Sequence, residues 1–417
     1  MPLDDSPSDF AEKLTRSLIA DLHSHYPMHL VPGGPDAARL VRSPRARRRL
    51  LDRLRALIVG LASRFANYES FESGPRVTVP LLRSGDVRVV FSVLYSPFDE
   101  FDLALPYGSP PAMQYVGGVL RQLELVERDV ERNFAAQATV ARDPRELDAV
   151  LAAGKIALVH CVEGGFHLGG SPEDVERAVE RLAHRGVAYV TLAHLVWRSV
   201  ATNANAIPFL PSPLYRLLFP QPRTGLTELG HAAVRAMVRH GVLVDVSHMS
   251  GRALDDTFAL LDELDPEHTV PVIASHSAYR FGRDSYNLDE ATVERIAARD
   301  GVIGLLLAEH QLADGVRLRR TGSLTESLEV VFRHLDRIRE IAGSHRHSAI
   351  GSDLDGFIKP TLAGLEDAGS LAALGRALGD RYGEADAELI ASGNALRLLR
   401  SHWRSSLIRL DDPAPGA

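Results

Sequence analysis

The chain has 417 residues, of which 45% are hydrophobic and 24% charged, the composition of an ordinary globular protein with a full core. This length suits one large α/β barrel or two to three smaller domains. A formal net charge of −7 argues against nucleic acid or an anionic membrane as the main partner. The single cysteine, Cys161, excludes an internal disulfide and a cysteine-rich zinc site.

The sequence carries no visible targeting or membrane signal. Its first residues, MPLDDSPSDF, are acidic and lack the charged and apolar regions of a signal peptide. No apolar run reaches the length that spans a bilayer, and the last residues form no hydrophobic tail. We therefore expect a cytoplasmic protein without a membrane partner.

Short apolar, β-branched runs alternate along the chain with amphipathic helical patterns, which indicates strand–helix units around a parallel sheet. Eight strands are predicted, at 17–25, 87–94, 156–164, 188–194, 242–248, 271–277, 302–308 and 348–356. Eight such units predict a (β/α)8 TIM barrel, with residues 1–417 as a single domain. A doubly wound open sheet is the alternative, but no G-x-G-x-x-G motif or P-loop follows a strand.

Two of the predicted helices have recognisable ends. Ser171 is an N-cap candidate, followed by a proline at the first helical position and by acids in the first turn, and this helix stops at Gly186. Thr227 is the N-cap candidate of a second helix that stops at Gly241. Both helices lead, through a Gly-Val step, into a strand that ends in histidine.

Two stretches depart from the strand–helix alternation. Residues 31–86 form an insertion after the first strand, and the basic run 42–57 within it predicts a solvated amphipathic helix, with a nucleic-acid patch as the alternative. Residues 199–224 form a loop over the pocket, rich in proline and aromatic residues at 208–223. This loop could serve as a lid or substrate wall, or could simply pack against the barrel.

Ionisable residues collect at the predicted carboxyl ends of the strands, where barrel enzymes place their active sites. They are His23, His25, Glu163, His194, His248, His276, Asp353 and Asp355. Residues two apart on a strand point the same way, so His23 and His25 should both face the barrel mouth. Imidazoles together with a carboxylate form a ligand set that suits Zn²⁺. Five ligands exceed the needs of one catalytic zinc, which predicts two metal ions bridged by Glu163.

Each of these residues also has an ordinary structural interpretation. A single histidine at a strand end is usually a hydrogen-bonded residue, Glu163 could cap a loop, and Asp353 and Asp355 could be turn acids. A chance gathering of so many ionisable groups at one end of a barrel is much less favourable, because burying them without a metal is costly. We expect Cys161 to be a small buried side chain rather than a ligand.

The remaining histidines fall into two groups. His29 and His167 lie just beyond strand ends, where they could orient metal ligands from behind. Five others lie in helical or loop patterns and are predicted to face solvent: His184, His240, His334, His345 and His347.

The sequence resembles the membrane (renal) dipeptidases of the amidohydrolase superfamily from residue 21 to about 400. The similar stretches are VTVPLLRSGDVRVVFSVLYSP, GKIALVHCVEGGFHL, GVAYVTLAHLVWRSVATNAN, GLTELGHAAVRAMVRHGVLVDVSHMS, PVIASHSAYRF, YNLDEATVERI, AIGSDLDGF and ASGNALRLL. The resemblance implies a TIM barrel of the metal-dependent hydrolase type, holding two Zn²⁺ ions or other divalent metals, that hydrolyses small peptide or amide bonds.

The resemblance also implies roles for individual residues, carried over by motif. His23 and the residue at 25 match the first-strand metal ligands, and Glu163 matches the bridging carboxylate. His248 and His276 match the ligands of the second metal. His194 matches the histidine that contacts the substrate carbonyl and the tetrahedral intermediate. Asp353 matches the acid/base that handles protons on the attacking water and the leaving amine.

The chain departs from the family pattern at three places. The family usually has His-x-Asp on its first strand, where this sequence has His25 as the second ligand. The arginine that grips a dipeptide's terminal carboxylate is replaced by Tyr286, although Arg280 and Arg283 are near in sequence. The seventh strand ends GLLLA, where the family tends to have a polar and aromatic end. The candidate substrate-binding residues are therefore Tyr286, Arg280 and Arg283, together with Asn203 and His194.

Our first hypothesis is therefore a binuclear zinc-dependent hydrolase of small amide or dipeptide-like substrates. The alternative keeps the metal barrel but assigns a tailoring step on a biosynthetic intermediate, an N-acyl amino acid or a lactone. A non-catalytic metal-binding barrel is a third hypothesis. The expected partner is a small molecule, and a homodimer is the default assembly.

Overall fold

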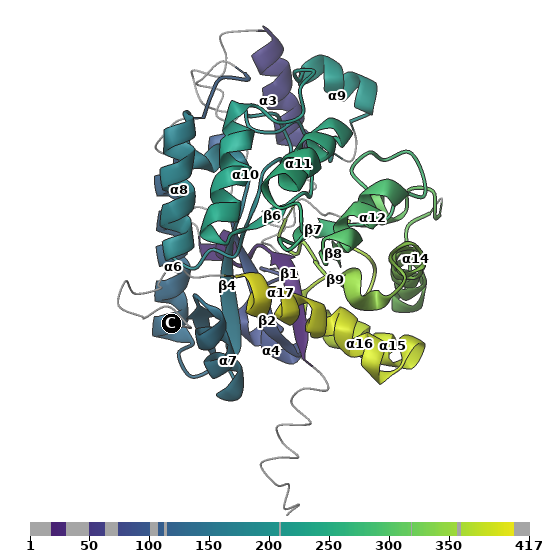
Figure 1. Ribbon diagram of the computed structural model, residues 1–417. Helices are drawn as coiled ribbons and strands as arrows, with labels where there is room; N and C mark the ends of the chain where they lie inside the picture. Colours follow the sequence, from purple (N-terminus) through teal and green to yellow (C-terminus); the bar gives the residue numbers. More distant parts are fainter. Residues whose placement is uncertain are drawn as a thin grey trace, which may run out of the picture.

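The fold is seen in a computed structural model (Figure 1), which describes residues 18–30, 50–62, 74–100, 107–111, 115–207, 210–317, 319–356 and 360–403. Its strands form one parallel sheet: β1 (Ile19–Ser24), β2 (Val87–Leu94), β3 (Ala138–Ala141), β4 (Ile156–Glu163), β5 (Tyr189–Thr191), β6 (Leu243–Asp245), β7 (Val272–Ser277), β8 (Val302–Leu305) and β9 (Ser348–Ile350).

Eight of these strands close into a ring, which confirms the predicted (β/α)8 barrel. The order runs β2-β1-β9-β8-β7-β6-β5-β4, and pairing of β2 with β4 closes it. Each predicted strand corresponds to one member of the ring. β3 is additional: it pairs with residues 156–159 of β4, below the short stretch, 162–163, where β5 pairs. It was not predicted because polar residues, Gln137 and Arg142, border its four residues, whereas the equally short ring strands lie within longer apolar runs.

The strands are surrounded by helices (Figure 1). These are α3 (Leu50–Ala62), α4 (Val79–Ser84), α5 (Pro97–Glu100), α6 (Tyr115–Asn133), α7 (Pro144–Ala152), α8 (Pro172–His184), α9 (Ser212–Leu218), α10 (Glu228–His240), α11 (Gly251–Leu264), α12 (Glu290–Ala298), α13 (Glu309–Leu312), α14 (Leu324–Ala342), α15 (Leu371–Tyr382), α16 (Glu384–Glu388) and α17 (Asn394–His402). Short 3₁₀ turns are η1 (Tyr26–Leu30), η4 (Gly165–Leu168), η5 (His345–His347) and η6 (Ala368–Ser370), and η7 (Leu389–Gly393) is a π-helical turn.

The two helices with predicted ends begin and stop as expected. The Ser171 hydroxyl accepts a hydrogen bond from the backbone N–H of Asp174, and Thr227 does the same for Gly230. Gly241 ends α10 in the left-handed region at φ 67°, a conformation that glycine adopts without strain. Both helices pack their apolar faces against the neighbouring strands in one continuous core. These caps fix where β5 and β6 begin, and so where His194 and His248 fall.

The two irregular stretches each contain a helix. In 31–86, the described residues include α3, which covers the later part of the predicted basic helix, and α4, which packs next to β2. The arginine-rich residues 42–49 lie outside the described residues. In 199–224, α9 lies beside α3 at the carboxyl end of the barrel (Figure 1). None of the helices in the described part of the chain is long and apolar enough to cross a membrane.

The prediction that five histidines face solvent is wrong for three of them. His334, His345 and His347 are buried. His334 is satisfied there by the backbone, because its Nε2–H donates to the Leu312 carbonyl and its Nδ1 accepts from the Tyr279 N–H. His345 and His347 lie on η5, where His347 Nδ1–H donates to the Gly301 carbonyl, a contact that the sequence pattern alone does not reveal.

Candidate metal centre

Glu163, the last residue of β4, lies at the centre of the ionisable cluster and is 1% exposed. Its Oε1 lies 3.3 Å from His23 Nε2, 3.4 Å from His276 Nε2 and 3.6 Å from His248 Nε2. Its Oε2 lies 3.4 Å from His25 Nε2 and 3.2 Å from His194 Nε2. Each carboxylate oxygen therefore faces its own group of imidazoles.

The first-strand histidines reach Glu163 from the end of β1. His25 directly follows β1, and its ring lies edge-on to that of His23 at 5.2 Å. On the far side of the His23 ring, Nδ1 lies 2.8 Å from the Tyr189 hydroxyl and 3.1 Å from that of Ser275. Because the Tyr189 hydroxyl donates to the Leu22 carbonyl, it accepts from His23 Nδ1–H. This bond leaves the Nε2 lone pair of His23 directed toward Glu163.

His248 and His276 approach from β6 and β7, with their Nε2 atoms only 2.8 Å apart. His276 is on β7, whereas His248 follows β6 in the left-handed backbone region at φ 65°. That conformation is uncommon for residues other than glycine, and such backbone strain collects at functional sites. Burial, then the neighbouring imidazoles, hold the pKa of both side chains well below the usual range. Both rings are therefore neutral, as metal ligands must be.

The positions of these side chains suit binding to a metal ion better than hydrogen bonding to one another. Both Glu163 oxygens and His23 Nε2 are buried without a hydrogen-bond partner, which is costly unless a cation binds them. Ligands bound at 2.0–2.1 Å around a tetrahedral zinc lie roughly 3.3 Å from one another. The spacing of Glu163 Oε1 from the imidazoles of His23 and His276 matches this value.

Asp353 lies at the edge of the same cluster, after β9. Its Oδ1 is 3.1 Å from His25 Nε2, and its backbone is left-handed at φ 57°. Burial raises the pKa of Asp353 to about 6, against the opposing effect of His25. Asp355 plays a different part, because its carboxylate accepts hydrogen bonds from the backbone N–H groups of Arg76 and Val77. That contact ties the chain before α4 to the barrel mouth.

His194 is held by a carboxylate that the sequence analysis did not identify. Glu100, at the end of α5, is 1% exposed, and its Oε2 accepts from His194 Nδ1–H at 2.6 Å. The Tyr95 hydroxyl and the Val196 N–H donate to the same carboxylate. Burial alone would lower the pKa of His194, but Glu100 and Glu163 raise it to about 9. Glu100 falls in an ordinary acidic stretch, FDEFD, which gave no signal of this role.

A second unpredicted carboxylate, Asp245 on β6, lies behind the metal ligands. Its Oδ2 accepts from the Ser275 hydroxyl at 2.6 Å. The Ser275 oxygen can then accept from His276 Nδ1–H at 2.9 Å, and it lies 3.1 Å from His23 Nδ1, whose one proton it shares with the Tyr189 hydroxyl. This single hydroxyl therefore fixes two imidazoles with Nε2 toward Glu163. Such supporting hydrogen bonds orient metal ligands in proteins generally.

The four other candidate substrate-binding residues differ in their burial and in the residues that they contact. Tyr286 is buried edge-on to the His248 ring at 4.9 Å, and its hydroxyl donates to the His276 carbonyl. Arg280 bonds to the backbone of its own loop and to Asp289, and Arg283 is exposed. Asn203 is buried, and its amide N–H donates to the Tyr215 hydroxyl of α9. Of these four, Tyr286 alone contacts an imidazole that faces Glu163.

The cysteine and the two outlying histidines do not reach Glu163. Cys161 is fully buried in the apolar core, as predicted. His29 stacks edge-on against Tyr26, and His167 accepts from the Ser96 N–H. His167 is buried beside the Tyr95 ring, which packs against His194.

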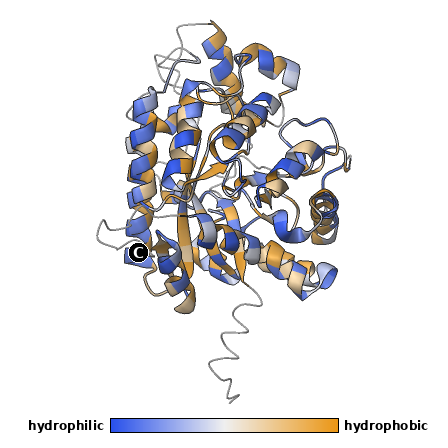
Figure 2. Cartoon of the chain, viewed as in Figure 1, coloured by the Kyte–Doolittle hydropathy of each residue, from blue (hydrophilic) through white to orange (hydrophobic). Residues whose placement is uncertain are grey.

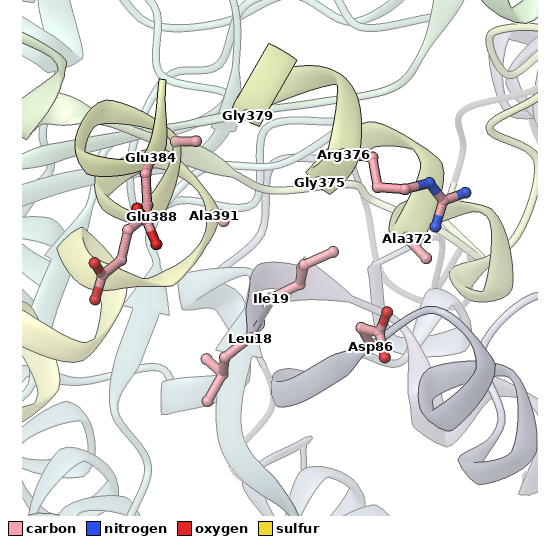
Figure 3. Close-up of a pocket in the computed structure, with 11 residues that line it drawn as sticks. Leu18, Ile19, Asp86, Ala372, Gly375, Arg376, Gly379, Glu384, Glu388 and Ala391 are labelled. Carbon is pink, nitrogen blue, oxygen red and sulfur yellow. The ribbon is translucent and has the colours of Figure 1, made fainter. Parts of the chain in front are cut away.

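The amino end of the barrel has a cavity of its own, of about 290 Å³ (Figure 3). Ile19, the first residue of β1, lies in its middle, with Glu384 and Glu388 on one side and Arg376 and Asp86 on the other. Glu384, Glu388 and Arg376 are exposed.

Comparison with known proteins matches residues 41–406 to the family described as membrane dipeptidase (peptidase family M19). The chain belongs to the membrane dipeptidase family. The match begins after His23 and His25, so the first-strand departure from the family pattern lies before the matched residues.

Curated relatives in this family are fungal dipeptidases. The chain is 26% identical to dipeptidase verJ of Clonostachys rogersoniana over 288 residues, which cover 69% of this chain and 65% of that protein. It is 28% identical to dipeptidase aclJ of Aspergillus oryzae over 336 residues, 78% of this chain and 69% of that one. The match to dipeptidase tcpJ of Claviceps purpurea covers 59% of the relative. The match thus spans less than two thirds of verJ and of tcpJ.

Solved structures share the fold. The crystal structure of dipeptidase AC, an M19 metallopeptidase, has a TM-score of 0.66 at 22% identity and covers 93% of this chain and 99% of its own. A metallopeptidase from Rhodobacter sphaeroides, liganded with a phosphinate mimic of L-Ala-D-Ala, has a TM-score of 0.65 at 22% identity, covering 92% and 99%.

Proposed function

We propose that the protein is a binuclear zinc-dependent hydrolase that cleaves small amide or dipeptide-like substrates. One observation carries this proposal: five imidazole Nε2 atoms surround the two oxygens of a buried carboxylate that has no other partner. Membership of the membrane dipeptidase family supports the same reaction class.

Five residues would hold the two metals, and Glu163 would bridge them. By the family pattern His23 and His25 would serve one ion and His248 and His276 the other, although in the structure His23 shares Glu163 Oε1 with His248 and His276. When bound, the ions would polarise the substrate carbonyl and lower the pKa of a bound water toward neutrality. Because His25 replaces the anionic ligand usual in the family, the site has one negative charge fewer, and we propose that its metal preference differs accordingly.

Two residues of the chain would move or hold protons during hydrolysis. His194, kept protonated by Glu100, would donate from Nε2 to the oxygen on which negative charge develops as the carbonyl is attacked. Asp353, whose pKa is raised to about 6, would take a proton from the attacking water and pass it to the leaving nitrogen. A carboxyl group with a pKa near the working pH can do both.

A further part of the proposal concerns how the protein binds a charged group of the substrate. Tyr286 occupies the place of the family's carboxylate-binding arginine, and its hydroxyl is engaged by the His276 carbonyl. Arg280 is engaged by its own loop. Arg283 is the remaining cation among the candidates, and it is exposed. We therefore propose a substrate held less by a terminal carboxylate than a typical dipeptide would be.

A neighbouring cavity of about 500 Å³ offers room for the rest of the substrate. Asn203 and Ser285 line it, together with Arg216 and Arg252. Its wall is joined to the metal centre, because the N–H of Ala204 donates to the His248 carbonyl at 2.7 Å. The polar lining suits a substrate with hydrogen-bonding groups beyond the scissile amide.

The test combines metal analysis with a dipeptide assay. We expect purified protein to hold about two zinc equivalents per chain and to hydrolyse at least some L,L- or L,D-dipeptides. Asp353→Asn should bind both metals and lose about 10²–10⁴-fold in turnover, because only the proton transfer is removed. Full turnover in metal-free protein would contradict the proposal.

The absence of the arginine favours a second candidate, a tailoring hydrolase acting on an N-acyl amino acid, a lactone or another biosynthetic intermediate. The same metal-loaded enzyme would be assayed against N-acyl amino acids and lactones beside the dipeptides. Faster turnover of these substrates would select the second candidate, and strong turnover of dipeptides alone would remove it.

A further inference from the structure

The cavity of about 500 Å³ beside the metal centre is lined by charged residues of one sign only. Arg216 of α9 and Arg252 of α11 line it, and none of the described residues in its wall is acidic. The amino-end cavity, by contrast, combines Arg376 with the carboxylates of Asp86, Glu384 and Glu388. A wall whose charges are all positive attracts an anion, because no neighbouring carboxylate offsets their potential.

Neither arginine of this wall has a carboxylate partner in the described part of the chain. Arg216 is exposed on α9 and forms no ion pair there. The Arg252 guanidinium donates to the backbone carbonyl of Arg223, an uncharged acceptor that holds the side chain in place without neutralising it. Both guanidinium groups therefore keep their charge and their paired N–H donors available, which suits them to bind an oxyanion.

The first turn of α11 opens on the same cavity. Ser250, the N-cap, and Gly251, the first helical residue, both line it, and a Cβ added at Gly251 would meet no atom within 4 Å. The Ser250 hydroxyl accepts from the Ala253 N–H, whereas the N–H groups of Gly251 and Arg252 have no acceptor among the described residues. N–H groups at the start of this 14-residue helix carry partial positive charge, which adds to that of the arginines.

Asn203 provides an independent indication of a ligand in this cavity. It lines the cavity and is 4% exposed, and its amide N–H groups donate to the Leu195 carbonyl and the Tyr215 hydroxyl. Its Oδ1 is buried and has no hydrogen-bond partner. Burying an amide oxygen in this way is costly unless a donor binds it. An N–H group of a bound substrate would supply that donor.

The helix α9 carries different residues on its two sides. Ser212, Tyr215 and Arg216 lie three and four residues apart, the spacing of one helical face, and all three line the cavity. Leu214 and Leu217, which do not line it, are exposed. Figure 2 shows both kinds of residue on α9, apolar in orange and hydrophilic in blue. The polar face of α9 is therefore the one that faces the cavity.

We propose that this cavity binds an oxyanion of the substrate, a carboxylate or phosphate group remote from the scissile amide, through Arg216 and Arg252. This assignment rests on the proposed function, because it takes the metal centre as the place where the amide is cleaved. Ser250 lies two residues after His248, and Ser285, also in the wall, directly precedes Tyr286, so the cavity adjoins the metal centre. One substrate would occupy both.

The proposal defines the class of substrate as an acidic amide. Its negative charge lies on a substituent that α9 and α11 bind, rather than where an arginine in place of Tyr286 would bind a terminal carboxylate. An N–H beside that substituent donates to Asn203 Oδ1. Residues 199–224 then form a substrate wall, one of the two uses predicted for this loop from the sequence.

The first experiment measures binding without turnover. Metal-loaded Asp353→Asn protein is titrated calorimetrically with dipeptides that differ in one charge: alanyl-glutamate against alanyl-glutamine, and aspartyl-alanine against asparaginyl-alanine. We expect the acidic member of at least one pair to bind about 10–100-fold more tightly, the usual effect of a charged hydrogen bond. Alanyl-phosphoserine against alanyl-serine shows whether phosphate is preferred to carboxylate.

Arginine variants locate the bound charge. In the double variant Arg216→Met, Arg252→Met, the ratio of acidic to neutral affinity should fall to about one. The control Arg177→Met replaces an exposed arginine of α8 that does not line the cavity, and should keep the ratio. Because Arg216 and Arg252 are exposed, all variants should keep the circular dichroism spectrum of the parent. Equal affinity within every pair, or a preference that survives in the double variant, would overturn the proposal.

Steady-state kinetics separates this proposal from the proposed function. In active enzyme the double variant should reduce the preference in kcat/KM for the acidic peptide about 10–100-fold, mostly through KM, since the arginines bind the substrate before and during the reaction alike. Cleavage of acidic and neutral peptides with equal KM would refute the oxyanion site and leave the proposed function standing. Tight, arginine-dependent binding of the acidic peptide without any cleavage would support the oxyanion site and refute the proposed function.

Discussion

At the carboxyl end of the barrel the ionisable side chains are buried and face one another, whereas around the amino-end cavity they stand exposed at the rim. Glu163 is 1% exposed and surrounded by imidazoles, while Glu384, Glu388 and Arg376, which line the amino-end cavity (Figure 3), are exposed. Water can satisfy the amino-end charges at little cost. Water cannot solvate the two Glu163 oxygens, because both are buried, and neither has a hydrogen-bond partner.

The difference between the two ends shows that a cavity lined by charged residues is weak evidence for a catalytic or metal-binding site. What distinguishes the metal centre is polar atoms that are buried, mutually oriented and left without protein partners. The following predictions test that distinction, beginning with the largest expected effect.

Glu163→Gln should remove most of the metal and reduce turnover by more than roughly 10³-fold, about 4 kcal/mol in the barrier. The amide supplies one neutral oxygen where the carboxylate faces two groups of imidazoles. Metal content per chain and kcat/KM measure the effect. Glu388→Gln, the matched change at the amino end, should leave both unchanged; an equal loss there would erase the contrast between the two ends.

Glu100→Gln should lower kcat by about 10²-fold while metal content stays at the wild-type value. The carboxylate is the main reason that the pKa of His194 is raised to about 9 despite burial, so the neutral amide lets His194 lose its proton near neutral pH. Steady-state kinetics should show the loss mostly in kcat. A variant that loses metal instead would show that Glu100 supports the fold of the centre rather than the charge on His194.

Asp245→Asn should weaken metal binding by about 10–100-fold, the usual effect of losing a residue that orients metal ligands. Asp245 accepts from Ser275, which positions His23 and His276. Competition with a chromophoric chelator gives the affinity without reference to activity. Asp265, a buried carboxylate that pairs with Arg299 away from the cluster, supplies the control Asp265→Asn, for which we expect unchanged metal affinity.

His334 extends the comparison to a buried imidazole whose two nitrogens both have partners. Burial lowers its pKa to about 4 from a usual 6.5. The unfolded chain therefore binds this proton first, so the free energy of unfolding should fall as the pH drops from about 6.5 to 4. The contribution is at most about 3 kcal/mol. Urea unfolding of His334→Gln should show a shallower decline over this range, and an unchanged slope would contradict the assignment.

The barrel was predictable from sequence because each of its eight ring strands is a short apolar run next to a helical pattern. β3 was missed because polar residues border its four residues on both sides, so no longer apolar run marks it. The ligand cluster was predictable for a related reason. His23, Glu163, His248 and His276 each end or follow a strand, and parallel strands bring such residues to one end of the barrel.

Glu100 and Asp245 could not be found in this way. Glu100 acts from a short helix after β2, and nothing in the sequence shows that this helix turns back over His194. Asp245 falls in the middle of the predicted strand 242–248, where its carboxylate is indistinguishable from an ordinary buried acid until Ser275 is placed beside it. The outward orientation of the α3 leucines was missed as well, because the pattern of α3 does not say which face is inward.

The backbones of His248, Asp353 and Asp355 all adopt the left-handed region, which glycine occupies at a lower steric cost. Each such residue costs the folded chain of the order of 1 kcal/mol. Directed evolution for heat resistance would therefore favour glycine at His248 and Asp353, and would lose the reaction in doing so. The barrel mouth is a place where thermal stability and chemistry select for different amino acids.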